Sequence, residues 1–202
     1  MVDVDEYLYI VNDTLKNYLS SEKFSKCDFI KIHWANTQDN NLIYYEQRPL
    51  FQRFTKPYIK SKYIKTIIRG NITDLKYWVH SPYISPYRNI TCTNDGNIIY
   101  YKNMNFEFIN NINTNKSYLI HFRYKSTEEL VNKLKRGYFN WSGNKLKKCL
   151  SRIIESYFKE NRITLEKINF LEKELKYNLS FYKSRISSNK SLYYIPNELI
   201  IN

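Results

Sequence analysis

The chain has 202 residues, of which 43% are hydrophobic and 17% aromatic, and its formal net charge is +13. This apolar content excludes a wholly disordered chain, and the length suffices for one substantial core or a core with an appendage. No apolar run approaches the roughly 20 residues that a membrane-spanning helix needs. The positive charge permits binding to nucleic acid, an anionic membrane surface or a phosphorylated donor, and it also agrees with a composition rich in residues of AT-rich codons.

The three cysteines, Cys27, Cys92 and Cys149, are widely spaced and odd in number. Their spacing matches no metal-ligand motif. Residues 1–10 also lack a positive leader followed by a long apolar stretch. We therefore expect no disulfide framework and a cytoplasmic protein.

Alternation of apolar and polar residues with period two predicts strands in the first part of the chain. Residues 1–10 alternate acidic and apolar side chains before YLYI, which predicts a strand with its acidic residues at the tip. Asp13 or Thr14 is expected to cap a short helix that ends near Leu19. Further strands are predicted at residues 27–35, 42–46, 63–69, 97–101 and 117–124.

Helices are predicted from Ser126 onward. Ser126 stands before Thr-Glu-Glu and an apolar run, a pattern typical of a helix start, and Gly137 is expected to end this helix. Apolar residues then recur at helical spacing at positions 146–157 and 165–175, which predicts two amphipathic helices. The residues that follow are weakly patterned.

Asp3, Asp5 and Glu6 form an acidic cluster near the N-terminus. If they lie at a strand end, the carboxylates of Asp3 and Asp5 point to one side and are suited to bind Mg²⁺ or Mn²⁺. The motif alone is weak, and a solvated acidic terminus is the alternative. Of the histidines, His33 is interpreted as structural, as is His80, whereas His121 precedes a turn into a helix and is open to either a structural or a ligand-binding role.

Six segments occur in a characteristic order over residues 1–137. They are DVDEYLYI, CDFIKIHWANTQDN, PLFQRFTKP, KYIKTIIRG, WVHSP and SYLIHFRYKSTEELVNKLKRG. Together they resemble the second half of the glycosyltransferases of families 2 and 92. The resemblance implies an α/β chain with part of a GT-A fold, whose Rossmann-like sheet forms a nucleotide site at its strand ends. We accordingly expect the C-terminal part of a GT-A domain at residues 1–140 and a helical tail at 141–202.

The resemblance also implies a metal site. Asp3 and Asp5 correspond to the metal-binding pair, which holds Mn²⁺ or Mg²⁺, and Glu6 supports them. His121 takes the place of the C-terminal histidine that often completes the metal shell in these families. The metal would bridge the diphosphate of a nucleotide-sugar donor and stabilise the leaving phosphate.

Other residues receive donor and acceptor roles. Lys125 and Ser126 match the Lys-Ser turn of the family and are expected to bind the donor diphosphate. Asp39 is the candidate catalytic base, because it is the carboxylate in the turn that follows the strand with Trp34. The implied reaction transfers a sugar, with inversion, to a hydroxyl of a glycan or lipid-linked acceptor.

The chain departs from the family pattern in two ways. The turn at residues 36–41 contains no glycine, which bears on the loop geometry around Asp39. The acidic motif begins at residue 3, whereas βα units with the nucleotide-binding part precede it in the relatives. We therefore expect either a complementary N-terminal half, self-association, or a truncated protein whose status as an enzyme is open.

Two alternative functions stay open at this point. One is a catalytically inactive remnant or interaction module. The other is nucleic-acid binding, which the charge and the twenty tyrosines suggest, but the dispersed basic residues and the absence of a recognised motif make a nucleic-acid partner unexpected. The basic amphipathic segment at 145–185 is expected to pack on the core or a second copy, with peripheral membrane contact as its alternative.

Overall fold

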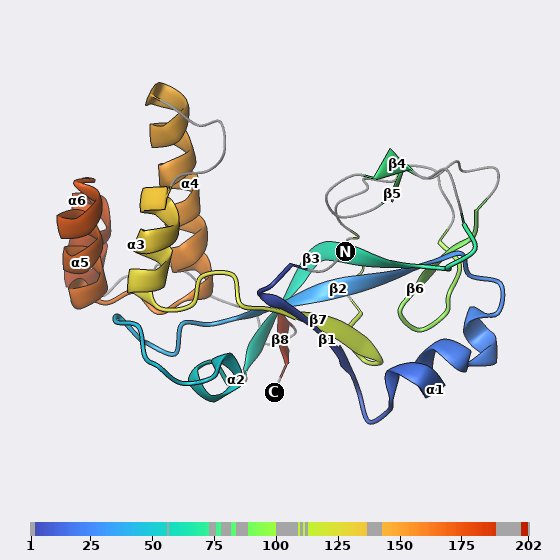
Figure 1. The fold of residues 1–202 in the computed structure, drawn as a ribbon. Coiled ribbons are helices and arrows are strands. Elements are labelled where there is room, and N and C mark those ends of the chain that lie inside the picture. The colour runs from blue at the N-terminus through green and yellow to red at the C-terminus, as the bar shows by residue number, and fades with distance from the viewer. Residues whose placement is uncertain are drawn as a thin grey trace. The chain divides into compact units, whose positions relative to one another are not determined.

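The computed structural model describes most of the chain (Figure 1). The described residues are 3–55, 57–72, 76–77, 82–83, 89–99, 109, 111, 113–136, 143–188 and 199–201. They confirm the predicted α/β class. They divide into two compact units that draw on alternating parts of the sequence, and this division differs from the boundary expected near residue 140. Unit 1 takes its described residues from Met1–Asn36 and Lys60–His121, and unit 2 takes them from Thr37–Ile59 and Phe122–Asn202.

A mixed sheet has most of its residues in unit 1. Its strands are β1 (Glu6–Ile10), β2 (Phe29–Thr37), β3 (Tyr58–Ile68), β6 (Thr91–Thr93), β7 (Ser117–His121) and β8 (Ile200–Ile201). Strand β8 and residues 58–59 of β3, with which it pairs, are assigned to unit 2. In the described residues the order is β1-β7-β2-β3-β8, and β6 pairs with β2. Strand β7 is antiparallel to β1 and parallel to β2. A separate antiparallel pair joins β4 (Lys76–Tyr77) to β5 (Pro82–Tyr83).

The central strand β2 is buried along its whole length, which explains its apolar run. Four polar side chains on it are also buried, namely Lys31, His33, Asn36 and Thr37. The Lys31 ammonium donates to the hydroxyl of Thr66 at 3.0 Å, and burial lowers the pKa of Lys31 to about 7. His33 Nε2 lies 3.3 Å from the carbonyl oxygen of Ile109, in agreement with the structural role expected for this histidine.

Cys27 and Cys92 form a disulfide, so the expectation of no disulfide was wrong. Parallel pairing places Cys92 of β6 opposite Ile30 of β2, close to Cys27, and the two Cα atoms are 5.8 Å apart. The cysteines are 65 positions apart in sequence, so spacing alone gave no sign of this contact. Disulfides persist in oxidising compartments, which counts against the cytoplasmic location; that location stays a prediction. No helix in the described ranges is long and apolar enough to cross a membrane.

Short elements connect the strands. Helix α1 (Leu15–Ser20) begins as predicted, because the hydroxyl of Thr14 accepts a hydrogen bond from the Asn17 amide. A 3₁₀ turn, η1 (Glu22–Phe24), follows it. Arg69, just after β3, donates to the carbonyl oxygens of residues 24, 25 and 27 at 2.9 to 3.0 Å. These bonds fix the segment that carries Cys27.

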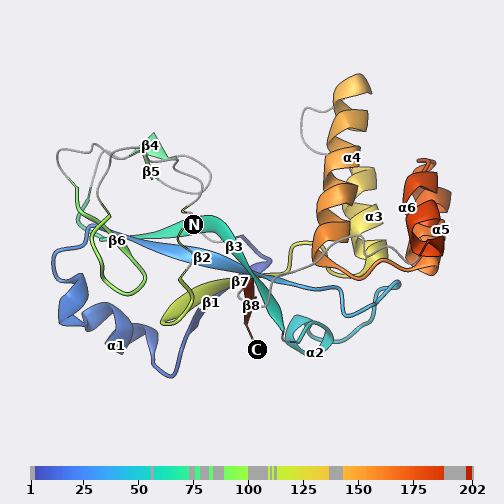
Figure 2. The same cartoon turned by 180° about the vertical axis from the view of Figure 1, so that it is seen from behind.

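Helices form the core of unit 2. They are α2 (Leu50–Arg53), α3 (Thr127–Arg136), α4 (Gly143–Glu160), α5 (Leu165–Leu175) and α6 (Ser180–Ser187). Figures 1 and 2 show α3 beside α4, and α5 beside α6. Apolar side chains from α3, α4, α5 and α6 pack into one cluster that contains Leu130, Ile154 and Leu171. The three helices predicted from Ser126 onward are confirmed as α3, α4 and α5, but Gly137, the predicted end of the first, lies outside the described residues. Helix α6 was not predicted, because its sequence is weakly periodic.

Residues 42–46 do not form the predicted strand. The carbonyl oxygens of Leu42 and Ile43 accept hydrogen bonds from the amides of Thr127 and Glu128 at 3.0 and 2.8 Å. These amides belong to the first turn of α3, where a helix leaves its N–H groups without internal partners. This segment therefore supplies hydrogen-bond acceptors to the start of α3 and does not join a sheet.

The disulfide predicts a redox-dependent stability. The bond closes a loop of 65 residues and so restricts the unfolded chain. For a loop of this length, the lost entropy of the unfolded chain stabilises the folded state by about 4 kcal/mol. We expect Cys92→Ser, or reduction of the wild-type chain, to lower the free energy of unfolding by up to this amount. Cys149 is free and half-buried, so Cys149→Ser is the control and should change stability little. Denaturant unfolding with and without reductant measures the difference, and equal curves would contradict the bond.

Candidate functional site

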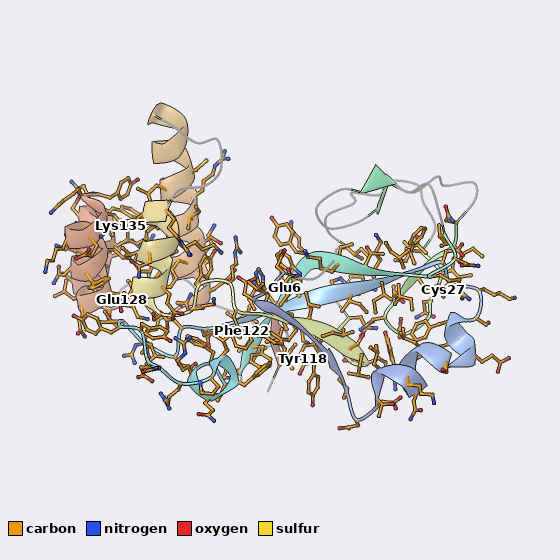
Figure 3. All side chains as sticks on the ribbon, in the orientation of Figure 1. Glu6, Cys27, Tyr118, Phe122, Glu128 and Lys135 are labelled. Carbon is orange, nitrogen blue, oxygen red and sulfur yellow. A yellow bond between two sulfur atoms is a disulfide. The ribbon has the colours of Figure 1, made fainter. Side chains whose placement is uncertain are left out.

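The acidic motif forms a turn before β1. The amide of Glu6 donates to the carbonyl oxygen of Asp3 at 3.0 Å, and the amide of Asp3 donates to Glu6 Oε2 at 3.1 Å. Strand β1 begins only at Glu6, so Asp3 and Asp5 lie in this turn rather than along a strand as expected. Glu6 marks the place in Figure 3 and lies at the opposite end of the unit 1 strands from Cys27.

The side chain of Lys65, from β3, contacts two carboxylates of this turn. Its Nζ lies 3.1 Å from Asp3 Oδ2 and 3.3 Å from Glu6 Oε2. The Glu6 side chain is fully buried, whereas 60% of the Asp3 side chain is exposed. Burial raises the pKa of Glu6, and the Asp3 amide and the Lys65 ammonium oppose that shift. The second carboxylate oxygen of Glu6, Oε1, is buried and has no hydrogen-bond partner among the described residues.

His121 joins the same turn from the end of β7. Sheet register places it opposite Glu6 on one side and opposite Asn36 on the other. Its Nε2 atom lies 4.0 Å from Asp5 Oδ1, and its ring packs 4.4 Å from the ring of Trp34, measured between centroids. The imidazole is therefore buried against an aromatic side chain, with one nitrogen near a carboxylate.

These side chains suit a divalent cation by their chemistry. Carboxylate oxygens and an imidazole nitrogen are ligands that Mn²⁺ accepts, and metal–ligand bonds of about 2.1 Å allow two ligand atoms to lie about 4 Å apart. Asp5 and His121 meet this condition. Asp3 is instead paired with Lys65. Within the described residues, no group of three or more His, Cys, Asp or Glu side chains is arranged to hold a metal ion.

The residues predicted to bind the donor diphosphate lie in unit 2. Lys125 adopts a left-handed backbone conformation with φ of 58° immediately before α3. The buried hydroxyl of Ser126 accepts from the Glu129 amide at 3.2 Å, and the amide of Ser126 donates to Glu129 Oε2 at 3.2 Å. This reciprocal pair is a capping box. Ser126 thus begins α3, and the donor-binding role of Lys125 and Ser126 stays a prediction.

The predicted base Asp39 is buried in unit 2. Its Oδ2 lies 2.6 Å from Lys167 Nζ and accepts a hydrogen bond from the hydroxyl of Tyr157. Its Oδ1 accepts from the Asn41 amide at 2.9 Å, and its own amide donates to the Asn161 side chain at 2.6 Å. The exposed fractions of the Asp39 and Lys167 side chains are 2% and 1%. Both carboxylate oxygens of Asp39 are occupied by donors. To accept a proton as a base, Asp39 would first have to lose at least one of these contacts.

Burial also changes the acidity of the groups around Asp39. It lowers the pKa of Lys167, and the Asp39 carboxylate opposes that shift. Burial together with the same carboxylate raises the pKa of Tyr157 well above its usual value, so this hydroxyl stays protonated and donates. Lys167 Nζ and the Tyr157 hydroxyl both contact the same buried carboxylate oxygen of Asp39.

Sequence reasoning missed Lys65 and Lys167. Lys65 stands in the KYIKTIIRG segment that contributes to the family resemblance, which was the available signal. Lys167 is a charged residue among the apolar positions of α5, and a helical projection would have placed it beside Ile168 and Leu171, which are also buried. His80 lies outside the described residues.

No family model, curated protein or solved structure matches this chain.

The buried pair of Asp39 and Lys167 predicts a strong coupling. Removing one partner leaves the other charge buried, which costs about 3–5 kcal/mol. We expect Asp39→Asn and Lys167→Met each to lower the free energy of unfolding by about this amount. The double variant should lose less than the sum of the single variants, because no lone charge remains. Chemical unfolding of the three variants measures the coupling.

The exposed i,i+4 pair of Glu155 and Lys159 is the matched control. Glu155→Gln and Lys159→Met should each change stability by at most about 0.5 kcal/mol. Additive, small effects at Asp39 and Lys167 would contradict the buried pair.

The capping box makes a separate prediction for Ser126. Replacing Ser126 by alanine removes the acceptor for the Glu129 amide, which costs about 1 kcal/mol. Asn132→Ala, at an exposed position in the middle of α3, is the control and should not destabilise the chain. Chemical unfolding checks both values. Unchanged stability of Ser126→Ala would show that its hydroxyl is not needed by the helix.

Proposed function

We propose that this chain is part of a metal-dependent glycosyltransferase that transfers a sugar from a nucleoside-diphosphate donor to a hydroxyl of a glycan or lipid-linked acceptor. The observation that carries the proposal is the meeting of the acidic turn with His121 in unit 1, where Asp5 Oδ1 and His121 Nε2 are 4.0 Å apart. The family resemblance named these residues from sequence order alone. Their proximity after folding supports the assignment.

The proposed architecture is a partial GT-A fold. It is supported by the mixed sheet of unit 1, in which β2 is parallel to β6 and β7. It is also supported by the antiparallel pairing of β1, which follows the acidic motif, with β7, which ends at His121. A sheet of this kind collects ligand-binding residues at its strand ends.

In the proposed site, Asp3, Asp5 and His121 hold Mn²⁺ or Mg²⁺. The bound ion would neutralise the diphosphate as it leaves. Packing against Trp34 holds the His121 ring in position, and the hydrogen bond from the Asp3 amide to Glu6 holds the turn closed. Asp39 is the proposed base, and it can accept the acceptor proton only after the Tyr157 hydroxyl or the Lys167 ammonium has moved.

Calorimetric titration tests this proposal. We expect the purified chain to bind uridine, guanosine or cytidine diphosphate in the presence of Mn²⁺, and the variant Asp3→Ala/Asp5→Ala to lose that binding by at least about tenfold, because it lacks two ionic ligands. Asp13→Ala/Glu22→Ala is the control, since it removes the same charge from exposed positions outside the site. The control should bind as the wild type does.

A well-folded wild-type chain that binds neither Mn²⁺ nor any of the three diphosphates would contradict the proposal. Equal binding by wild type and the Asp3→Ala/Asp5→Ala variant would place the metal elsewhere. The first result would leave the family resemblance without a matching activity in this chain, and the second would contradict the roles of Asp3 and Asp5.

A further inference from the structure

We propose that Lys65 exchanges partners when the site is loaded. Its ammonium neutralises Asp3 and Glu6 while no divalent cation is bound, and it pairs with the diphosphate of the donor once a cation has taken the carboxylates. This inference rests on the proposed function and adds to it a residue that recognises the diphosphate.

The contacts of Lys65 are the first step of the argument. Its Nζ lies within 3.3 Å of carboxylate oxygens from both Asp3 and Glu6. The lysine is itself largely buried, with 9% of its side chain exposed. An ammonium held by two carboxylates in this way already neutralises Asp3, which is one of the proposed metal ligands.

Charge is the second step. The turn collects the carboxylates of Asp3, Asp5 and Glu6, and Lys65 is the cation that the structure places against two of them. Two cations close together repel each other, so a divalent ion bound by Asp3 and the Lys65 ammonium at its present position oppose one another. The exposed Asp3 side chain is the place where a cation from solvent can compete.

The buried carboxylate of Glu6 is the third step. Glu6 Oε2 has the Asp3 amide and Lys65 as partners, but Oε1 is buried and has no hydrogen-bond partner among the described residues. Leaving a buried carboxylate oxygen without a partner is costly. Such an oxygen is suited to a further cationic or hydrogen-bonding group when the site is loaded.

The chemistry of lysine is the fourth step. Its ammonium is a compact charge with three donors on a flexible four-carbon chain, so the group can turn away from the carboxylates while its backbone in β3 stays fixed. Released from Asp3, the ammonium is free to bind a phosphate oxygen, which is a common partner for lysine. The diphosphate of the donor would supply these phosphate oxygens next to the proposed metal site.

The variants Lys65→Met and Lys65→Arg test the exchange. Lys65→Met removes the charge and keeps an unbranched side chain of similar length, and Lys65→Arg keeps the charge. Lys62→Met removes the same charge from an exposed position on the same strand and is the control. Calorimetry first measures Mn²⁺ alone, and then the diphosphate that the wild type binds, at saturating Mn²⁺. Thermal unfolding of each variant confirms that it is folded.

The expected effects have opposite signs. Lys65→Met should bind Mn²⁺ about fivefold to tenfold more tightly, because the competing ammonium is gone, and the diphosphate about tenfold more weakly, because one ionic partner is lost. Lys65→Arg and Lys62→Met should stay close to the wild type in both titrations. If Lys65 only supported the fold, its replacement would instead weaken the binding of both Mn²⁺ and the diphosphate.

Two results overturn the inference, and they differ from each other. If wild type binds Mn²⁺ through Asp3 and Asp5 but Lys65→Met binds both ligands as wild type does, or binds both more weakly, the exchange is wrong and the proposed function stands. If neither wild type nor Lys65→Met binds Mn²⁺ in a way that Asp3→Ala/Asp5→Ala abolishes, the proposed function fails and the inference fails with it.

Discussion

Strand β7 pairs with β1 on one side and with β2 on the other, and this double pairing organises the candidate site. The two registers place Glu6 and Asn36 on either side of His121. Backbone hydrogen bonds along three strands therefore bring together residues from distant parts of the chain. Trp34, two positions before Asn36 on β2, packs against the His121 ring through the same pairing. Without the pairing of β7 with both β1 and β2, the acidic turn would be a short exposed segment with no partner for its carboxylates.

Each unit holds a contact between lysine and carboxylate, and solvent exposure makes the two contacts different. The Asp39–Lys167 pair is almost completely buried, so breaking it leaves a charge without water or a partner. That pair is suited to holding the helices of unit 2 in place. In the contact of Lys65 with Asp3, most of the aspartate side chain is exposed, so solvent screens the attraction and a ligand can compete for it. That contact is suited to exchange.

Several residues that the family resemblance assigns to chemistry also have structural contacts. Ser126 begins α3 through the capping box with Glu129, and Asp39 is the counter-charge of Lys167. The loop at residues 42–46 supplies carbonyl groups to the first turn of α3 instead of forming a strand. These contacts arise because a buried helix start requires partners for its amides, and nearby polar groups meet that requirement. A substitution at such a residue changes stability as well as binding.

The sequence by itself determined the α/β class, the helices α1, α3, α4 and α5, and the strands β2, β3 and β7, because local periodicity and capping residues encode these elements directly. It also named Asp3, Asp5 and His121 as one set through resemblance. Only the tertiary structure decided that Lys65 reaches Asp3, that Cys27 bonds to Cys92, and that Lys167 lies against Asp39. Each of these contacts joins residues far apart in the chain. Strand register and helix packing determine such distances, and neither is visible in local sequence patterns.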